Sequence, residues 1–169
     1  ARFLTIGYPG GPVIDKLSDI GDPTAIKFPR SLLEPDSLDF SFSGMKTAVL
    51  NYMKKHPDPS EQDQANIASS FQEAVVDVLK EKVRRAIVAT GHNRVIIAGG
   101  VAANRRLRSE LKAMSQAMGV ELFYPPLEYC TDNAAMIAAT GAMYYKKGWF
   151  SNLQIGAIPN LKLDEGANT

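Results

Sequence analysis

The sequence is poor in cysteine, histidine and tryptophan, and it lacks a long hydrophobic run. Cys130 is the only cysteine among 169 residues. A single cysteine excludes an internal disulfide, and its scarcity is typical of proteins from a reducing compartment. No apolar stretch approaches the roughly 18 residues that a membrane span requires. We therefore expect no membrane partner.

An excess of charge of one sign is also missing. The chain has 19 lysines and arginines against 18 aspartates and glutamates, which gives a net charge of +1. Overall charge therefore does not indicate a nucleic-acid-binding protein, and such a partner would have to meet a local patch. The length suits one domain with a core or one lobe of a larger enzyme. Because the sequence starts at Ala1 rather than at methionine, we expect a part of a longer protein.

The apolar pattern predicts an α/β fold that is rich in helix and has a small sheet, with parallel strands joined by a right-handed crossover. We expect one lobe over residues 1–148, with an irregular and helical part before residue 61, and a tail over 149–169. The expected elements are a turn at 7–12, a helix at 13–20, strands near 26–28 and at 38–43, helices at 45–55 and 61–90, a strand at 94–98, a helix at 104–118, a strand at 120–124 and a helix at 132–147.

Two adjacent glycines form the most informative local pattern. Gly99 and Gly100 end an apolar run, and a helix-forming segment follows them directly. Backbone amides without a nearby Cβ, together with the positive end of a helix dipole, favour a phosphate at such a place. The spacing matches neither the GxGxxG nor the Walker A pattern. A tight turn without a ligand is therefore the alternative.

Cationic residues at the start of the next helix are a second pattern. Arg105, Arg106 and Arg108 stand where acidic residues are preferred, which suggests an anionic partner such as phosphate or RNA. Ordinary surface arginines are the alternative. Asn104 is most simply an N-cap, although its amide could also bind a base or a ribose.

Asp132 follows an expected strand end, where open α/β sheets collect ligands. If Thr131 caps the last helix, Asp132 lies in its first turn and is favoured there by the helix dipole. The alternative is that its carboxylate binds a divalent cation or orients a polar substrate. Cys130 is interpreted as a small buried apolar residue rather than a nucleophile.

Four long motifs in order resemble one family. They are Tyr-Pro-Gly-Gly-Pro at 8–12, Asp-Phe-Ser-Phe-Ser-Gly-Met-Lys-Thr at 39–47, Ala-Gly-Gly-Val-Ala-Ala-Asn-Arg at 98–105 and Cys-Thr-Asp-Asn-Ala-Ala-Met-Ile-Ala at 130–138. The resemblance is to the C-terminal part of the tRNA threonylcarbamoyladenosine transferases of bacterial type, formerly called glycoproteases or O-sialoglycoprotein endopeptidases. It implies one lobe of the ribonuclease-H-like fold shared by actin, Hsp70 and sugar kinases.

The resemblance also implies an activity and a site. The family transfers a threonylcarbamoyl group from threonylcarbamoyl-adenylate to the adenosine 3′ of the anticodon in tRNA. The residues that would bind the adenylate, or an ATP analogue, are Gly11, Gly99, Gly100, Val101 and Asn104. Asp132 would act through a divalent metal, iron or zinc, as one of its ligands. Arg105, Arg106 and Arg108 are candidates for contact with tRNA.

The sequence departs from the family pattern in one serious respect. The two histidine ligands of the family, spaced His-x-x-x-His on the N-terminal lobe, are absent. We therefore expect the isolated chain to bind metal weakly and to be inactive. The family implies a paralogous non-catalytic subunit and a small ATPase as partners, and a cytoplasmic or organellar location. An ATP-dependent kinase of the same fold and a non-catalytic scaffold paralogue are the alternatives.

Overall fold

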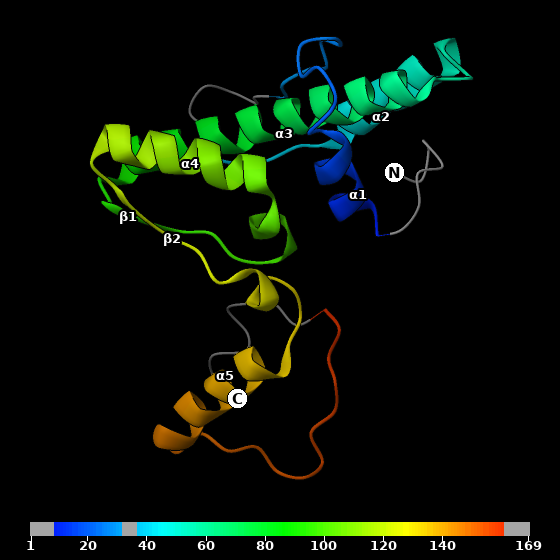
Figure 1. Ribbon diagram of the computed structural model, residues 1–169. Helices are drawn as coiled ribbons and strands as arrows, with labels where there is room; N and C mark the ends of the chain where they lie inside the picture. The colour runs from blue at the N-terminus through cyan, green and yellow to red at the C-terminus, as the bar shows by residue number, and fades with distance from the viewer. Residues whose placement is uncertain (1–8, 32–36, 161–169) are drawn as a thin grey trace. The chain divides into compact units, whose positions relative to one another are not determined.

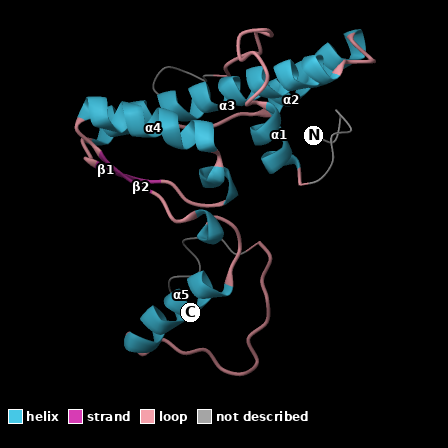
Figure 2. Ribbon diagram, in the orientation of Figure 1, coloured by secondary structure: helices cyan, strands magenta, loops and turns pink. Residues whose placement is uncertain are grey.

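The computed structural model describes residues 9–31 and 37–160, and the chain divides into two units after Thr131. The first unit contains α1 (Gly10–Leu17), α2 (Ser43–Lys55), α3 (Glu61–Thr90), β1 (Arg94–Ile96), the 3₁₀ helix η2 (Gly100–Ala103), α4 (Arg105–Met118), β2 (Glu121–Phe123) and the 3₁₀ helix η3 (Leu127–Tyr129) (Figures 1 and 2). The second unit contains α5 (Ala134–Lys146). The sequence predicted one lobe up to residue 148, whereas the division after Thr131 leaves α5, none of whose residues is buried, in the second unit.

The long helix α3 has the bounds that the sequence predicts, because its two ends are encoded locally. The Asp63 amide donates to Ser60 Oγ at 3.2 Å, and the Ser60 amide donates to the Asp63 carboxylate at 3.1 Å. This capping box satisfies two amides at the helix start. At the other end, Gly91 has φ 68°, a left-handed conformation that glycine adopts without strain.

Two apolar clusters lie on α3 and form the core of the first unit. The first joins α3 to α2 and to the segment around Phe28, and it contains Phe28, Met45, Ile67, Ala74 and Val78. The second joins α3 to α4 and the sheet, and it contains Val76, Leu107 and Leu111 with Ile97 and Leu122 packed against them. The expected apolar face of the long helix is therefore two faces, each with its own partner.

The sheet has two strands in the expected parallel arrangement, with Val95 opposite Leu122. Both strands are shorter than predicted, although the Ile97 amide still donates to Phe123 O at 3.0 Å beyond the end of β1. Leu122 packs against the α3–α4 cluster, whereas Ile96 and Phe123 are exposed. A strand exposes alternate side chains on opposite faces, so α4 covers one face of this sheet.

The two strands predicted before residue 60 are wrong. Within the described residues only β1 and β2 form a sheet, and a strand needs such a neighbour for its backbone hydrogen bonds. The Ile26 amide instead donates to the Ser70 hydroxyl at 3.1 Å. Over 38–43 the aromatic alternation leads to stacking of Phe40 on Phe42, with ring centroids 6.2 Å apart, and α2 begins at Ser43.

The first helix also differs from its prediction. The sequence indicated a turn at 7–12 and a helix at 13–20, but α1 begins at Gly10 and ends at Leu17. Pro12 lies in the first turn of α1, where the missing amide hydrogen of proline has no cost. Residues 7 and 8 of the expected turn lie outside the described residues.

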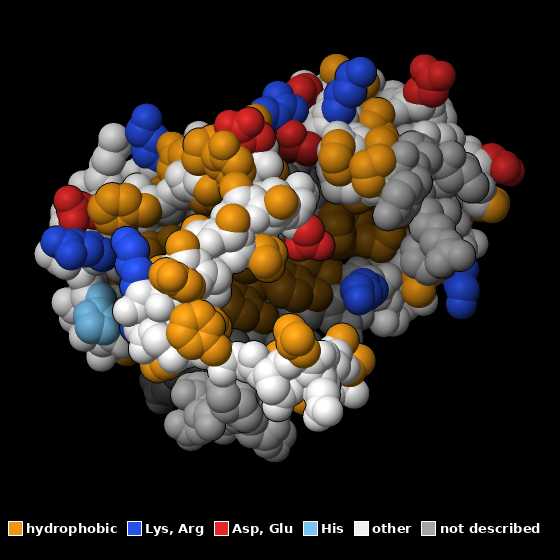
Figure 3. All heavy atoms as spheres, turned by 90° about the horizontal axis from the view of Figure 1, so that it is seen from below, with side chains coloured by type: hydrophobic (Ala, Val, Ile, Leu, Met, Phe, Trp, Pro, Cys, Tyr) orange, Lys and Arg blue, Asp and Glu red, His pale blue; other side chains and the backbone are white. Residues whose placement is uncertain are grey.

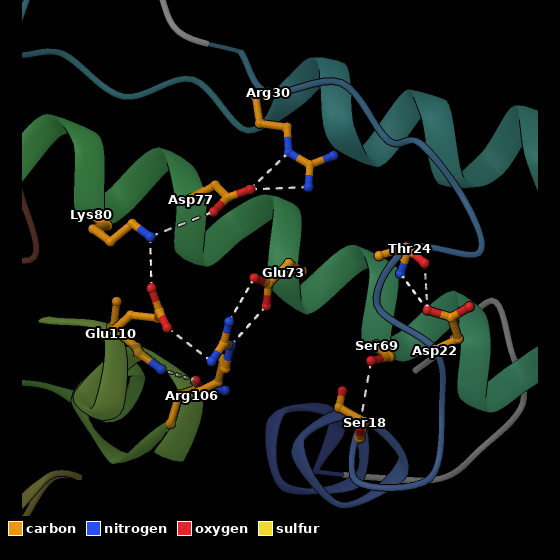
Figure 4. Close-up of polar contacts among 12 residues, drawn as sticks. Ser18, Asp22, Thr24, Arg30, Ser69, Glu73, Asp77, Lys80, Arg106 and Glu110 are labelled. Atoms are coloured by element: carbon orange, nitrogen blue, oxygen red, sulfur yellow. Dashed lines mark hydrogen bonds and ion pairs between the residues drawn. The ribbon is translucent and has the colours of Figure 1, made fainter. Parts of the chain in front are cut away.

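The loop that follows α1 is held to α3 by polar side chains. Asn66 Oδ1 accepts from the Asp22 amide at 2.9 Å, and the Ser70 hydroxyl donates to Asp22 O at 3.1 Å. Ser69, which is buried, donates to Ser18 O at 3.4 Å (Figure 4). Gly21 lies between these contacts, directly against the backbone of Ala65.

Ion pairs link α3 to α4 and to the segment before α2 (Figure 4). Arg30 pairs with Asp77 at 3.0 Å, and Lys80 pairs with Glu110 at 2.6 Å. Arg106 donates through two nitrogens to the two carboxylate oxygens of Glu73, each at 2.8 Å, and it also pairs with Glu110 at 2.9 Å. Hydrogen bonding from Arg106 lowers the pKa of Glu73, and burial opposes this only in part.

The lowered pKa of Glu73 predicts a pH-dependent contribution to stability. A carboxyl whose pKa falls on folding stabilises the folded state above its unfolded pKa, and this contribution is lost as the pH falls through the folded value. We expect Glu73→Gln to cost about 1 kcal/mol of unfolding free energy at pH 7 and a smaller amount at an acidic pH where Glu73 is protonated in the folded protein as well. Urea unfolding of both proteins across this range measures the difference. An equal loss at both pH values would contradict the prediction.

The second unit consists of α5 and the segment that follows it. Ile137, Met143 and Tyr145 of α5 are exposed, and the rings of Tyr144 and Trp149 lie 5.3 Å apart. Figure 3 shows hydrophobic side chains exposed on the face that it draws.

None of the helices in the described ranges combines the length and apolar character that a bilayer crossing requires.

Candidate functional site

The diglycine turn follows the carboxyl end of β1, as the sequence predicts. Gly99 has φ 80° and ψ 176°, a backbone conformation that residues other than glycine rarely adopt. Gly99, Gly100 and Val101 are exposed, and no heavy atom lies within 4 Å of a Cβ built on either glycine. The turn therefore has room for a ligand to approach its backbone closely.

One feature of this turn differs from the prediction. The α-helix does not open directly after the glycines, because the four residues of η2 intervene. The Ala102 amide donates to Gly99 O at 2.9 Å, and the Asn104 amide donates to Val101 O at 3.0 Å, so these amides are used within the turn. The backbone that directly follows the diglycine turn is thus the 3₁₀ helix η2 rather than the first turn of α4.

Asn104 caps α4, as expected, and also joins three helices. Its Oδ1 accepts from the Leu107 amide at 2.8 Å. Its Nδ2 donates to Gln72 Oε1 of α3 at 2.6 Å and to Asp15 Oδ1 of α1 at 3.2 Å. The residue predicted to contact a nucleotide is therefore held rigidly beside the diglycine turn by its own hydrogen bonds.

Gly11 is brought to the same region by α1. It is exposed and lies four residues before Asp15, so both are on one face of the helix. Because Asp15 contacts Asn104, this face of α1 lies beside the start of α4. Sequence reasoning grouped Gly11 with Asn104 but missed Asp15 and Gln72, for which the sequence carries no local signal.

Arg105 and Arg106 are paired with carboxylates of the chain itself. Arg105 donates to Asp15 Oδ2 at 2.7 Å and to Asp19 Oδ2 at 2.8 Å, and these hydrogen bonds raise its pKa. The hydrogen bond to Glu73 likewise raises the pKa of Arg106. These acids give Arg105 and Arg106 partners within the chain, where the sequence left open an external anion or ordinary surface arginines. Contact of these arginines with tRNA stays a prediction.

Arg108 is bound to backbone carbonyls. Its Nε donates to Ala102 O at 2.5 Å, and its Nη2 donates to Pro125 O at 2.8 Å and to Cys130 Sγ at 3.1 Å. Its guanidinium lies 4.5 Å from the centroid of the Tyr124 ring. Cys130 is buried, as the sequence indicated, and Arg108 is one of the groups that cover it.

Asp132 belongs to the second unit, and its predicted place in a helix is wrong. Asn133, not Thr131, is the N-cap of α5, and its side chain accepts from the Met136 amide at 2.9 Å. Asp132 is exposed and precedes the helix, so it is not an acid of the first turn. Among the described residues, no group of three His, Cys, Asp or Glu side chains could hold a metal ion.

Comparison with known proteins gives a consistent result. The model of a family described as tRNA N6-adenosine threonylcarbamoyltransferase matches residues 1–139. A protein with this name from Clostridium botulinum is 49% identical over 98% of this chain, and one from Thermosipho africanus is 48% identical over 96%. The chain spans about half the length (49%) of these relatives. The match extends through the diglycine turn, Asn104 and Asp132, and the chain belongs to the tRNA N6-adenosine threonylcarbamoyltransferase family.

Proposed function

We propose that this chain is the C-terminal part of an enzyme that transfers a threonylcarbamoyl group from threonylcarbamoyl-adenylate to the adenosine 3′ of the anticodon in tRNA. The observation that carries the proposal is the near-complete match of the chain to relatives of that name. The reaction is an acyl transfer from a mixed anhydride, and AMP is its leaving group. The site must hold the adenylate still and present the amine at attack distance.

The diglycine turn supports the proposed adenylate site. A phosphate needs backbone that it can approach closely, and the open space around Gly99 and Gly100 provides it. Asn104 would contact the nucleotide beside the same turn through its Oδ1, because both hydrogens of its Nδ2 already have acceptors on α1 and α3. Gly11, in α1, is a further residue that we propose to bind the adenylate. Val101, which is exposed next to the glycines, would contact the bound nucleotide through its side chain.

Asp132 is the proposed metal ligand of this chain. A carboxylate is a suitable ligand for iron or zinc, but such ions require several nitrogen or oxygen ligands together. The described residues supply no group of three, and we propose that the remaining ligands come from elsewhere in the full-length protein. A bound metal would supply a Lewis acid for the carbamoyl oxygen. We further propose a paralogous non-catalytic subunit and a small ATPase as partners of the full-length protein.

Comparing the full-length protein with residues 1–169 tests the proposed function. We expect the full-length protein to convert tRNA when it is given threonylcarbamoyl-adenylate, as measured by mass spectrometry of the digested nucleosides. We expect residues 1–169 alone to be inactive and to hold far less than one equivalent of iron or zinc by elemental analysis. An inactive full-length protein would contradict the transferase assignment. A tightly held equivalent of metal in residues 1–169 would contradict the shared site.

A further inference from the structure

We infer that Arg108 is a positioning residue, which fixes the proposed adenylate-binding turn to the loop that follows β2. The inference rests on the proposed function, because it concerns the same turn. It also gives Arg108 a role different from the tRNA contact that the sequence suggested. The contacts that support it lie entirely within the first unit.

The guanidinium of Arg108 joins two loops that are far apart in sequence. Ala102 belongs to η2, which follows β1, and Pro125 and Cys130 belong to the segment that follows β2. Arg108 contacts all three at 2.5, 2.8 and 3.1 Å respectively. Because β1 and β2 are parallel, both loops follow the carboxyl ends of the strands. Ligands bind at the carboxyl ends of the strands in such sheets.

The turn needs such an attachment because its own residues give it little rigidity. Two successive glycines lose more backbone freedom on ordering than other residues do. The hydrogen bond from the Ala102 amide to Gly99 O shapes the turn, and the bond from the Asn104 amide to Val101 O attaches it to the start of α4. The bond from Arg108 to Ala102 O adds an attachment to the loop that follows β2, and the planar guanidinium fixes its direction as well as its distance.

The partners of Arg108 also leave its charge available to the turn. The neighbouring Arg105 and Arg106 are paired with carboxylates, which offset their charges. Within residues 9–31 and 37–160, Arg108 donates to two backbone carbonyls and to the Cys130 sulfur, none of which is a carboxylate. A positive charge beside a proposed phosphate-binding turn favours an anionic ligand there.

Kinetics of the full-length protein test the inference. We expect Arg108→Ala to raise the KM for threonylcarbamoyl-adenylate by about tenfold, the usual effect of losing hydrogen bonds to a charged group, while the KM for tRNA stays unchanged. Arg108→Lys should give an intermediate KM, because an ammonium cannot reach both carbonyls in a planar arrangement. Leu111→Ala is the matched control, since it weakens the packing of α4 on α3 without removing any contact of Arg108. It should lower stability and leave the adenylate KM unchanged.

Two results would overturn the inference. One is an Arg108→Ala enzyme whose adenylate KM is unchanged or whose tRNA KM rises instead. The other is an equal rise of the adenylate KM in Leu111→Ala, which would show a merely structural effect. In either case wild-type activity would remain and the proposed function would stand. A wild-type enzyme that does not use the adenylate would overturn the proposed function, and the inference with it.

A readout that needs no activity tests the geometry itself. Cys130 is only 2% exposed and is the single thiol of residues 1–169. Removing the guanidinium that covers its sulfur should speed the reaction of Cys130 with an aromatic disulfide reagent by about tenfold relative to Leu111→Ala, when both are compared at alkaline pH so that loss of the neighbouring cation does not lower the fraction of reactive thiolate. An unchanged rate would show that Arg108 does not hold this loop, and it would overturn the inference.

Discussion

Asp132→Ala in the full-length protein is expected to lower tRNA modification by about a hundredfold or more. The expected cause is loss of the metal, because a transition-metal ion that loses one of few protein ligands binds far more weakly. Asp132 is exposed and is not part of α5, so the substitution should leave the fold unchanged. The assay measures modified adenosine in tRNA, and elemental analysis of the same sample measures the bound metal.

Glu128→Ala is the matched control for Asp132→Ala. Glu128 is also an exposed carboxylate and stands four residues earlier, in η3. Its loss should change neither activity nor metal content. If Asp132→Ala were as active as the wild type, the metal-ligand role would be wrong, and a scaffold function would be favoured.

Gly21→Ala is expected to cost about 3 kcal/mol of unfolding free energy, at the upper end of what overpacking usually costs. A Cβ at this position would lie 2.0 Å from Ala65 O and 2.4 Å from Ala65 C, far inside van der Waals contact. These are backbone atoms of α3, so no side-chain rotation relieves the overlap. The loop would have to move away from α3 and lose the hydrogen bonds of Asp22.

Thermal unfolding followed by circular dichroism measures this effect. A loss of this size corresponds to a fall in Tm of roughly 10 °C for a chain of this length. Gly141→Ala in α5 is the control, because a Cβ there meets no heavy atom within 4 Å. Alanine is a better helix former than glycine, so this control should be neutral or slightly stabilising. Equal effects of the two substitutions would contradict the proposed overlap at Gly21.

The parts of the fold that were predictable are those encoded by neighbouring residues. The start of α3 is set by Ser60 and Asp63, and its end is set by Gly91, all within one turn of the helix termini. Gly119, with φ 67°, ends α4 in the same way. The parallel sheet followed from two apolar runs on either side of a helix. Such signals need no knowledge of distant residues.

The predictions that failed depended on partners elsewhere in the chain or on a choice between adjacent residues. The alternation that ends at Phe42 resembles a strand, but a strand forms only where another strand accepts its hydrogen bonds. Thr131 and Asn133 are both good caps, and the backbone angles of Asn133 decide between them. The acid that pairs with Arg105 stands 90 positions away, and no local pattern identifies it.

The attachment of α1 to α4 has a consequence for folding during synthesis. Arg105 leaves the ribosome 90 residues after Asp15, which takes on the order of 5–20 s at ordinary rates of translation. Before α3 and α4 are made, the eight residues of α1 form a helix too short to persist in water on its own. The earliest helix of the chain therefore becomes stable only when partners encoded downstream, first α3 and then the start of α4, have been made.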